Sequence, residues 1–275
     1  MLLTNENYYS QEANREYLSV SQYKDFMGTY GKTGCEEYAL AKLDGTWVEN
    51  MEDSDALMVG SYVDAHFEGT LDLFKAQHSC MFKKDGSLMV KYIKANEMIN
   101  RCERDPLFMQ YMSGEKQVIM TADMFGAKWK IKIDSYHPGK CIVDLKTCQS
   151  ITKEFYHPDT GHLNFLAEWG YYIQGAVYQK VVEINTGKKL PFFIAAVSKE
   201  KVPDIQLIAV EQSLLDEAIT EVERNVPGIV ALKNGEVDPI RCEHCDYCKH
   251  TKILKAPIWS SELIGETSYE KSTIN

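Results

Sequence analysis

Residues 127–148, AKWKIKIDSYHPGKCIVDLKTC, decide the fold of this chain. Trp129, Ile131 and Ile133 alternate with lysines, so the first half predicts a β-strand with one apolar and one basic face. The HPGK turn separates it from CIVDLKTC, which predicts a second strand running back beside the first. With the preceding GEKQVIMTADMF, residues 114–125, the pattern predicts a β-meander.

Two carboxylates and a lysine lie on or directly after these strands. Asp134 follows the first strand, and Asp144 and Lys146 share one face of the second. The turn brings Asp134 opposite residue 143 or 144, and the sequence leaves that register open. Carboxylate and carbonyl oxygens, here including that of Leu145, suit a hard divalent cation, and a lysine can orient an attacking water. The alternative is an ion pair at a strand end.

Helices are predicted on both sides of this meander. Residues 19–43 predict two helices with Cys35 at the start of the second, and residues 54–69 predict one whose apolar stripe is interrupted by Asp64. Residues 90–102 predict another helix. A long helix is predicted over residues 164–184, and it carries Gln174 and Tyr178 one turn apart. The strands LPFFIAAVS and DIQLIAVE and a helix over residues 213–233 complete an α/β pattern.

The 275 residues have the size and composition of one globular domain, with 44% hydrophobic and 25% charged residues. We expect that domain over residues 19–264, between a flexible N-terminal segment, residues 1–18, and a flexible tail, residues 265–275. There is no apolar run of membrane-spanning length and no signal-peptide pattern at the start, so we expect a cytoplasmic protein without a membrane partner.

The net charge of −10 argues against nonspecific adhesion to nucleic acid. Local pattern points the other way, because five lysines are expected to form a basic face around the carboxylates: Lys128, Lys130, Lys132, Lys140 and Lys146. Three of the eight cysteines have ligand-like spacing in RCEHCDYCKH, namely Cys242, Cys245 and Cys248. They could bind zinc, with His244 or His250 as a further ligand, or remain free thiols.

An ordered set of motifs over residues 19–252 resembles the PD-(D/E)xK nuclease superfamily. The set comprises SVSQYKDF with a following cysteine, GSYVDAHFEG, KIKID, Asp-Leu-Lys at residues 144–146, and Gln174-x-x-x-Tyr178. It is most similar to the RecE-like exonucleases of phages and prophages, relatives of lambda exonuclease and of the RecB and AddB nuclease domains. The resemblance implies a mixed central β-sheet flanked by helices, as in restriction endonucleases.

The resemblance also implies a set of site residues. The implied catalytic residues are Asp134, Asp144, Lys146, Gln174 and Tyr178, and the implied ligands of Mg²⁺ or Mn²⁺ are Asp64, Asp134, Asp144 and the Leu145 carbonyl. Asp64 stands where these nucleases more usually have histidine. His66 and Glu115 are weaker candidates. One early and three late cysteines bind a 4Fe-4S cluster in related exonucleases, which implies the set Cys35, Cys242, Cys245 and Cys248; zinc or no metal are the alternatives.

The implied function is that of a Mg²⁺-dependent DNA exonuclease of a phage recombination system, working in a bacterial host. It would degrade one strand of linear duplex DNA, in the 5′-to-3′ direction, and leave a 3′ overhang for a single-strand annealing protein. A ring-shaped homo-oligomer is implied as well. The alternatives are a structure-specific endonuclease with the same fold, and a noncatalytic DNA-binding or adaptor protein that the cysteine-bound metal holds together.

Overall fold

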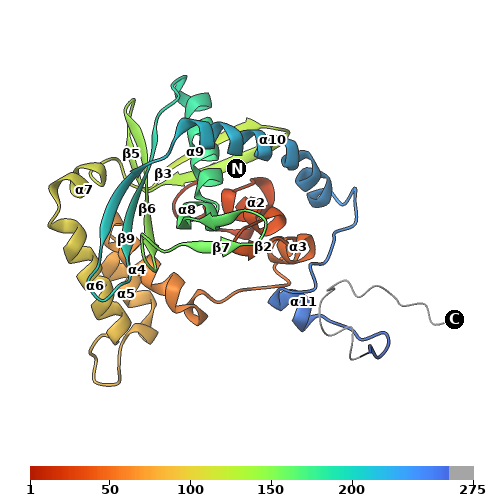
Figure 1. The fold of residues 1–275 in the computed structure, drawn as a ribbon, viewed down its shortest axis with the longest axis horizontal. Helices are drawn as coiled ribbons and strands as arrows, with labels where there is room; N and C mark the ends of the chain where they lie inside the picture. Colours follow the sequence, from red (N-terminus) through yellow and green to blue (C-terminus); the bar gives the residue numbers. More distant parts are fainter. Residues whose placement is uncertain (260–275) are drawn as a thin grey trace.

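A mixed four-stranded sheet forms the centre of the computed structural model, which describes residues 1–259 (Figure 1). Its strand order is β10-β9-β6-β5. Strand β6 (Cys141–Cys148) pairs in parallel with β9 (Phe192–Ser198), whereas β5 (Ser135–His137) and β10 (Ile205–Ala209) are antiparallel to their neighbours. The predicted mixed sheet flanked by helices is confirmed.

The predicted meander is divided into two parts at Asp134. Strands β3 (Val118–Met124) and β4 (Ala127–Ile133) form a separate two-stranded sheet, and β5 begins one residue after Asp134. Ser135 pairs with Val143, so the same register continued by one residue places Asp134 opposite Asp144. The structure thereby selects one of the two registers that the sequence left open.

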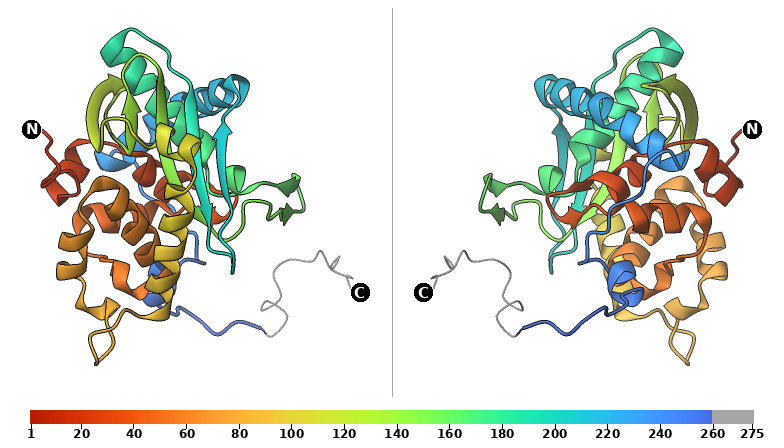
Figure 2. Two further views of the ribbon diagram at one scale, coloured as in Figure 1. Left: turned by 90° about the vertical axis from the view of Figure 1, so that its left-hand side faces the viewer. Right: turned by 90° about the vertical axis from the view of Figure 1, so that its right-hand side faces the viewer.

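The two faces of the sheet are covered by different helices. Helices α9 (Tyr171–Thr186), α10 (Gln212–Lys233) and α2 (Val20–Met27) belong to the core on one face, and α4 (Asp55–Glu68), α6 (Val90–Glu103) and α7 (Pro106–Tyr111) to the core on the other (Figures 1 and 2). Along β6, Ile142 packs toward α9, and Val143 and Leu145 pack toward α4. Because side chains alternate along a strand, Asp144 lies on the α9 side.

The remaining elements are short. They are α1 (Gln11–Glu16), β1 (Gly28–Thr29), β2 (Lys32–Thr33), α3 (Glu36–Asp44), α5 (Leu71–Gln77), β7 (Phe155–His157), β8 (Gly161–Leu163), α8 (Phe165–Glu168), α11 (Asp246–His250), and the single 3₁₀ turns Met51–Asp53 and Ser79–Met81. The β7–β8 hairpin projects from the body of the molecule (Figure 2). Within residues 1–259, no helix is long and apolar enough to cross a membrane.

Local signals place several helix ends where they were predicted. Ser54 caps α4, its hydroxyl accepting a hydrogen bond from Leu57 N, and Gly69 ends the helix in the left-handed conformation. The single helix predicted over residues 164–184 is wrong. Gly170 has φ 62°, so the chain breaks there into α8 and α9.

The expectation of a flexible segment over residues 1–18 is also wrong, because this segment is packed and contains α1. The ammonium of Lys130 is buried beneath it and donates hydrogen bonds to Tyr8 O (2.5 Å) and Asn14 Oδ1 (2.7 Å). Tyr8 and Leu18 are themselves buried. The apolar and aromatic residues in this polar stretch give it enough contact area to fold onto β4. The predicted tail, residues 265–275, lies outside the described residues.

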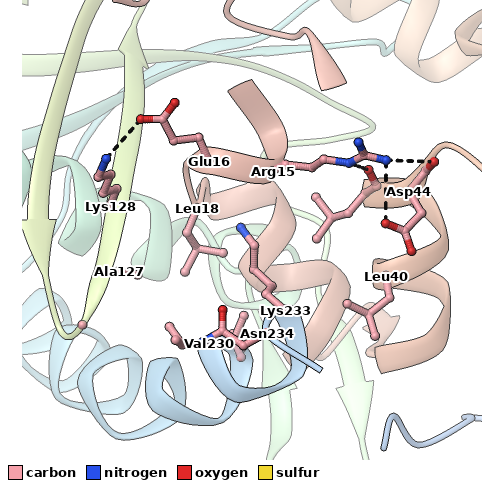
Figure 3. Close-up of a pocket in the computed structure, with 13 residues that line it drawn as sticks. Arg15, Glu16, Leu18, Leu40, Asp44, Ala127, Lys128, Val230, Lys233 and Asn234 are labelled. Carbon is pink, nitrogen blue, oxygen red and sulfur yellow. Dashed lines mark hydrogen bonds and ion pairs between the residues drawn. The ribbon is translucent and has the colours of Figure 1, made fainter. Parts of the chain in front are cut away.

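Hydrogen bonds and an ion pair at the surface hold Arg15 and Glu16, near the end of the same segment. Arg15 donates hydrogen bonds to the carbonyl oxygens of Leu43 and Asp44, and Glu16 pairs with Lys128 at 3.1 Å (Figure 3). These contacts line a cavity of about 460 Å³ between α1, α3, β4 and the end of α10. Two lysines of the basic face predicted on β4, Lys128 and Lys130, therefore have partners within the protein.

Candidate active site

The structure brings the predicted site residues together around one cavity of about 310 Å³. Helix α4 contributes one, the β4–β5 connection one, β6 three and α9 two. These lining residues are Asp64, Asp134, Asp144, Leu145, Lys146, Gln174 and Tyr178. They come from four separate parts of the chain, and the sheet and its two flanking helices position them.

Asp134 is held against the middle of β6. Its Oδ2 accepts a hydrogen bond of 2.8 Å from Leu145 N, and its Oδ1 faces Gln117 Nε2 at 3.5 Å. Burial raises the pKa of Asp134 to about 7, and the neighbouring charge of Asp144 adds to this effect. The site therefore contains a carboxylate that is costly to ionise unless a cation is close.

Lys146 forms an ion pair with Asp144 two residues earlier on the same face of β6. Burial alone would lower the pKa of Lys146, but the charge of Asp144, with those of Tyr171 and Asp134, outweighs this effect and raises it. The Lys146 ammonium also lies over the ring of Tyr171, 5.1 Å from the ring centre, which is within the range of a cation–π pair. Lys146 is thus a permanent cation beside the carboxylates at neutral pH.

Helix α9 supports this arrangement through two side chains. Gln174 Nε2 donates a hydrogen bond of 2.6 Å to Asp144 Oδ1, and the Tyr178 hydroxyl donates one of 3.1 Å to Lys132 O. Both side chains are therefore engaged within the protein. Gln174 orients a carboxylate, and Tyr178 holds the end of β4 just before Asp134.

Asp64 adds a further carboxylate to the cavity from α4, which covers the face of the sheet opposite to α9. Burial, followed by the charge of Asp134, raises its pKa. Glu68 lies one helical turn further along α4 and lines the same cavity. Several carboxylates, the Leu145 main chain and a concave site form a set of hard oxygen ligands, and a divalent cation would offset their mutual repulsion. The residues present therefore fit a Mg²⁺ or Mn²⁺ site.

The two weaker candidates lie away from this cavity. His66 Nε2 pairs with Glu103 Oε1 at 2.8 Å, and neither residue lines the cavity. The side chain of Glu115 is exposed, and its main chain forms an isolated β-bridge with Tyr136.

Sequence patterns missed other residues that line the cavity. Tyr8 and Tyr9 reach it from the packed N-terminal segment, and Lys24 reaches it from α2. Gln117 faces Asp134 with a left-handed backbone, φ 54°, which is uncommon for a residue with a side chain. The tyrosine pair was a detectable signal in an otherwise polar stretch, whereas the conformation of Gln117 left no trace in the sequence.

Four cysteines meet at a second site, where one cysteine from the start of the chain lies beside three from near its end. The sulfur atoms of Cys35, Cys242, Cys245 and Cys248 all lie within 4.8 Å of one another. Cys35 Sγ lies 3.6 Å from Cys248 Sγ, and Cys242 Sγ lies 3.9 Å from it. This set is compatible with a metal site that joins the start of α3 to α11. His250 instead packs its ring against Trp47.

A mixed sheet with a carboxylate before one strand and an Asp-x-Lys pair on the next defines the restriction-endonuclease-like, PD-(D/E)xK class of fold. The chain belongs to the family described as PDDEXK-like domain of unknown function (DUF3799), which matches residues 19–251.

A solved structure supports this assignment. The chain is similar to a protein from Eubacterium rectale whose crystal structure is described as that of a "putative exonuclease", with 56% sequence identity and a TM-score of 0.93. The similarity covers 96% of this chain and 99% of that chain. No curated protein matches the chain.

Proposed function

We propose that the protein is a divalent-metal-dependent DNA exonuclease that acts on linear duplex DNA. One observation carries the proposal: Asp134, Asp144 and Lys146 converge in a single cavity. Asp134 accepts a hydrogen bond from the main chain of β6, the strand that carries the other two. The family and the similar protein from Eubacterium rectale support the same reaction class.

The proposed metal ligands are Asp64, Asp134, Asp144 and the Leu145 carbonyl. A Mg²⁺ or Mn²⁺ ion bound there would polarise the scissile phosphodiester and make a bound water more acidic. Gln174 keeps Asp144 oriented toward the cavity through its 2.6 Å hydrogen bond. Such partners of ligating carboxylates commonly set metal affinity.

Lys146 is assigned the role of orienting the attacking water and stabilising charge on the phosphate. It is charged and lies beside Asp144 within the cavity. An ammonium in that position favours the pentavalent transition state more than the ground state, because negative charge accumulates on the phosphate oxygens. Tyr178 acts at one remove, through its hydrogen bond to Lys132 O.

The biological setting proposed is a phage recombination system in the cytoplasm of a bacterial host. The enzyme would remove one strand in the 5′-to-3′ direction and leave a 3′ overhang for a single-strand annealing protein. A ring-shaped homo-oligomer would surround the duplex. The ordered motifs of the RecE-like exonucleases support this setting, and light scattering in solution tests the oligomer, which a monomer would contradict.

The activity is tested by nucleotide release from linear duplex DNA labelled at either the 5′ or the 3′ end. We expect release that requires Mg²⁺ and that falls by about 100-fold or more in Lys146→Ala. Lys188→Ala, which removes an exposed lysine outside the cavity, is the control. Equal release by Lys146→Ala, or none by the wild type, would overturn the proposal. Cleavage of covalently closed circles would indicate the endonuclease instead.

We further propose that the four cysteines hold one metal ion as a structural staple. Four sulfur atoms at about 2.3 Å from one ion lie about 3.8 Å from each other in a tetrahedron. The separations of 3.6 Å between Cys35 Sγ and Cys248 Sγ and of 3.9 Å between Cys242 Sγ and Cys248 Sγ fall on either side of that value. A four-iron cluster fills the space between its thiolates and needs them further apart, so the geometry favours zinc over 4Fe-4S.

A further inference from the structure

A second cavity, of about 740 Å³, opens from the proposed active site toward the β7–β8 hairpin. Both cavities are lined by Asp64, Leu145, Lys146 and Gln174, so the two adjoin at these residues. The part beyond β6 is lined by Lys153, Phe155, Trp169 and Lys199, and we call it the lysine–aromatic groove. Phe155 belongs to β7, one strand of the hairpin that stands out from the body of the molecule (Figure 2).

The charge of this groove is opposite to that of the protein as a whole. The chain carries a net charge of −10, yet Lys146, Lys153 and Lys199 line the second cavity. Among residues 1–259, Asp64 is the one carboxylate that lines it, and Asp64 belongs to the proposed metal site. Positive charge is therefore concentrated along a path that ends at the site of cleavage.

Aromatic rings accompany these lysines. Trp169 keeps 43% of its surface exposed although it is a large apolar side chain. Its ring meets that of Phe155 edge to face, with centroids 6.3 Å apart, and the Lys153 ammonium lies 4.7 Å from the centre of the Phe155 ring. Exposed aromatic surface interleaved with cations is the combination that binds unpaired bases and their phosphates together.

We propose that the lysine–aromatic groove binds single-stranded DNA, namely the strand whose end enters the active site. Trp169 and Phe155 would stack on bases, and Lys153 and Lys199 would contact phosphates. In a duplex the bases are stacked on each other, so this groove selects a strand that has separated from its partner. The inference rests on the proposed nuclease function and adds the form of the substrate and the residues that hold it.

The test is fluorescence anisotropy of a labelled oligothymidine with the full chain, with Ca²⁺ in place of Mg²⁺. Trp169→Ala should weaken binding by about tenfold, and Trp169→Phe should restore most of it, because a second aromatic ring can stack on the same base. Lys153→Ala combined with Lys199→Ala should reduce the slope of log Kd against log salt by about 1.4, since each phosphate contact on a single strand contributes about 0.7.

Matched controls remove the same chemistry elsewhere. Lys84→Ala combined with Lys188→Ala deletes two exposed lysines, and Trp259→Ala deletes an exposed tryptophan, none of which lines the groove. These variants should bind like the wild type, and thermal unfolding checks that every variant is folded.

The outcomes separate this inference from the proposed function. Wild-type affinity in both groove variants would overturn the inference, even if the protein degrades linear DNA with Mg²⁺. Groove-dependent binding of oligothymidine would support it, even if Lys146→Ala released nucleotides as fast as the wild type and the proposed nuclease function failed.

Discussion

Gln174 Nε2, on α9, donates a hydrogen bond of 2.6 Å to Asp144 Oδ1, on β6. This contact links a helix on one face of the sheet to the strand that carries the Asp-x-Lys pair. It fixes one oxygen of Asp144 while the other faces Lys146. The carboxylate is thus oriented before any ion or substrate binds.

Removal of that hydrogen bond should weaken both metal binding and turnover. We expect Gln174→Ala to need a higher Mg²⁺ concentration for half-maximal nucleotide release, with activity about 10- to 100-fold lower at fixed Mg²⁺. Gln206→Ala on β10, where the glutamine is exposed, is the control. An unchanged Mg²⁺ dependence in Gln174→Ala would show that Asp144 does not need this partner.

Asp134 should reduce stability in magnesium-free buffer. The pKa of Asp134 in the folded protein is raised to about 7, above the ordinary value of 3.8. Ionisation of Asp134 therefore lowers the free energy of unfolding as pH rises from about 4 to 7. Asp134→Asn should therefore raise the free energy of unfolding by about 1–3 kcal/mol at pH 8 and by less at pH 5. Urea unfolding at both pH values measures this. Added Mg²⁺ should stabilise the wild type more than the variant.

Lys130 should contribute to stability through the segment that covers it. Lys130→Met keeps most of the side-chain volume but leaves Tyr8 O and Asn14 Oδ1 without their donor. We expect a loss of about 2 kcal/mol in the free energy of unfolding. Lys128→Met, which removes an exposed pair with Glu16, should cost less than about 1 kcal/mol. Equal effects of the two variants would contradict the packed N-terminal segment.

The cysteine site should contain one zinc ion for each chain. We expect colourless protein with stoichiometric zinc by elemental analysis, and Cys35→Ser should lose most of it. Cys80→Ser is the control, because Cys80 is exposed and lies outside the cluster. Brown protein that contains iron and acid-labile sulfide would show instead that the four thiolates separate to hold an iron–sulfur cluster.

The sequence predicted local features well where a short-range rule decides them. The start of α4 follows from the Ser54 cap, and the period-two alternation of a strand correctly separates Ile142 from Val143 and Leu145 on β6. The prediction of one long helix over residues 164–184 is wrong because Gly170 has a left-handed backbone conformation. A single glycine within an apolar helical pattern does not reveal that conformation. Glycine permits that turn without announcing it.

The N-terminal segment shows why other features could not be predicted. Residues 1–18 are polar in composition, and no periodicity marks them. Their order comes from contacts with residues more than a hundred positions away, such as Tyr8 with Lys130. The same contact buries a lysine that the strand pattern assigned to an open basic face. Long-range burial of this kind overrides local composition.

The sequence by itself determined the class of the protein, because strand alternation, helix caps and the spacing of Asp134, Asp144 and Lys146 are local and periodic. Tertiary structure alone decided which groups meet. Packing of the two helical layers on the sheet brings distant chain segments together. It sets Asp134 opposite Asp144 and allows the hydrogen bond from Gln174. It also places Cys35 beside Cys248 and forms the groove beside Trp169. Packing energy is a property of the whole core, and no short window of sequence contains it.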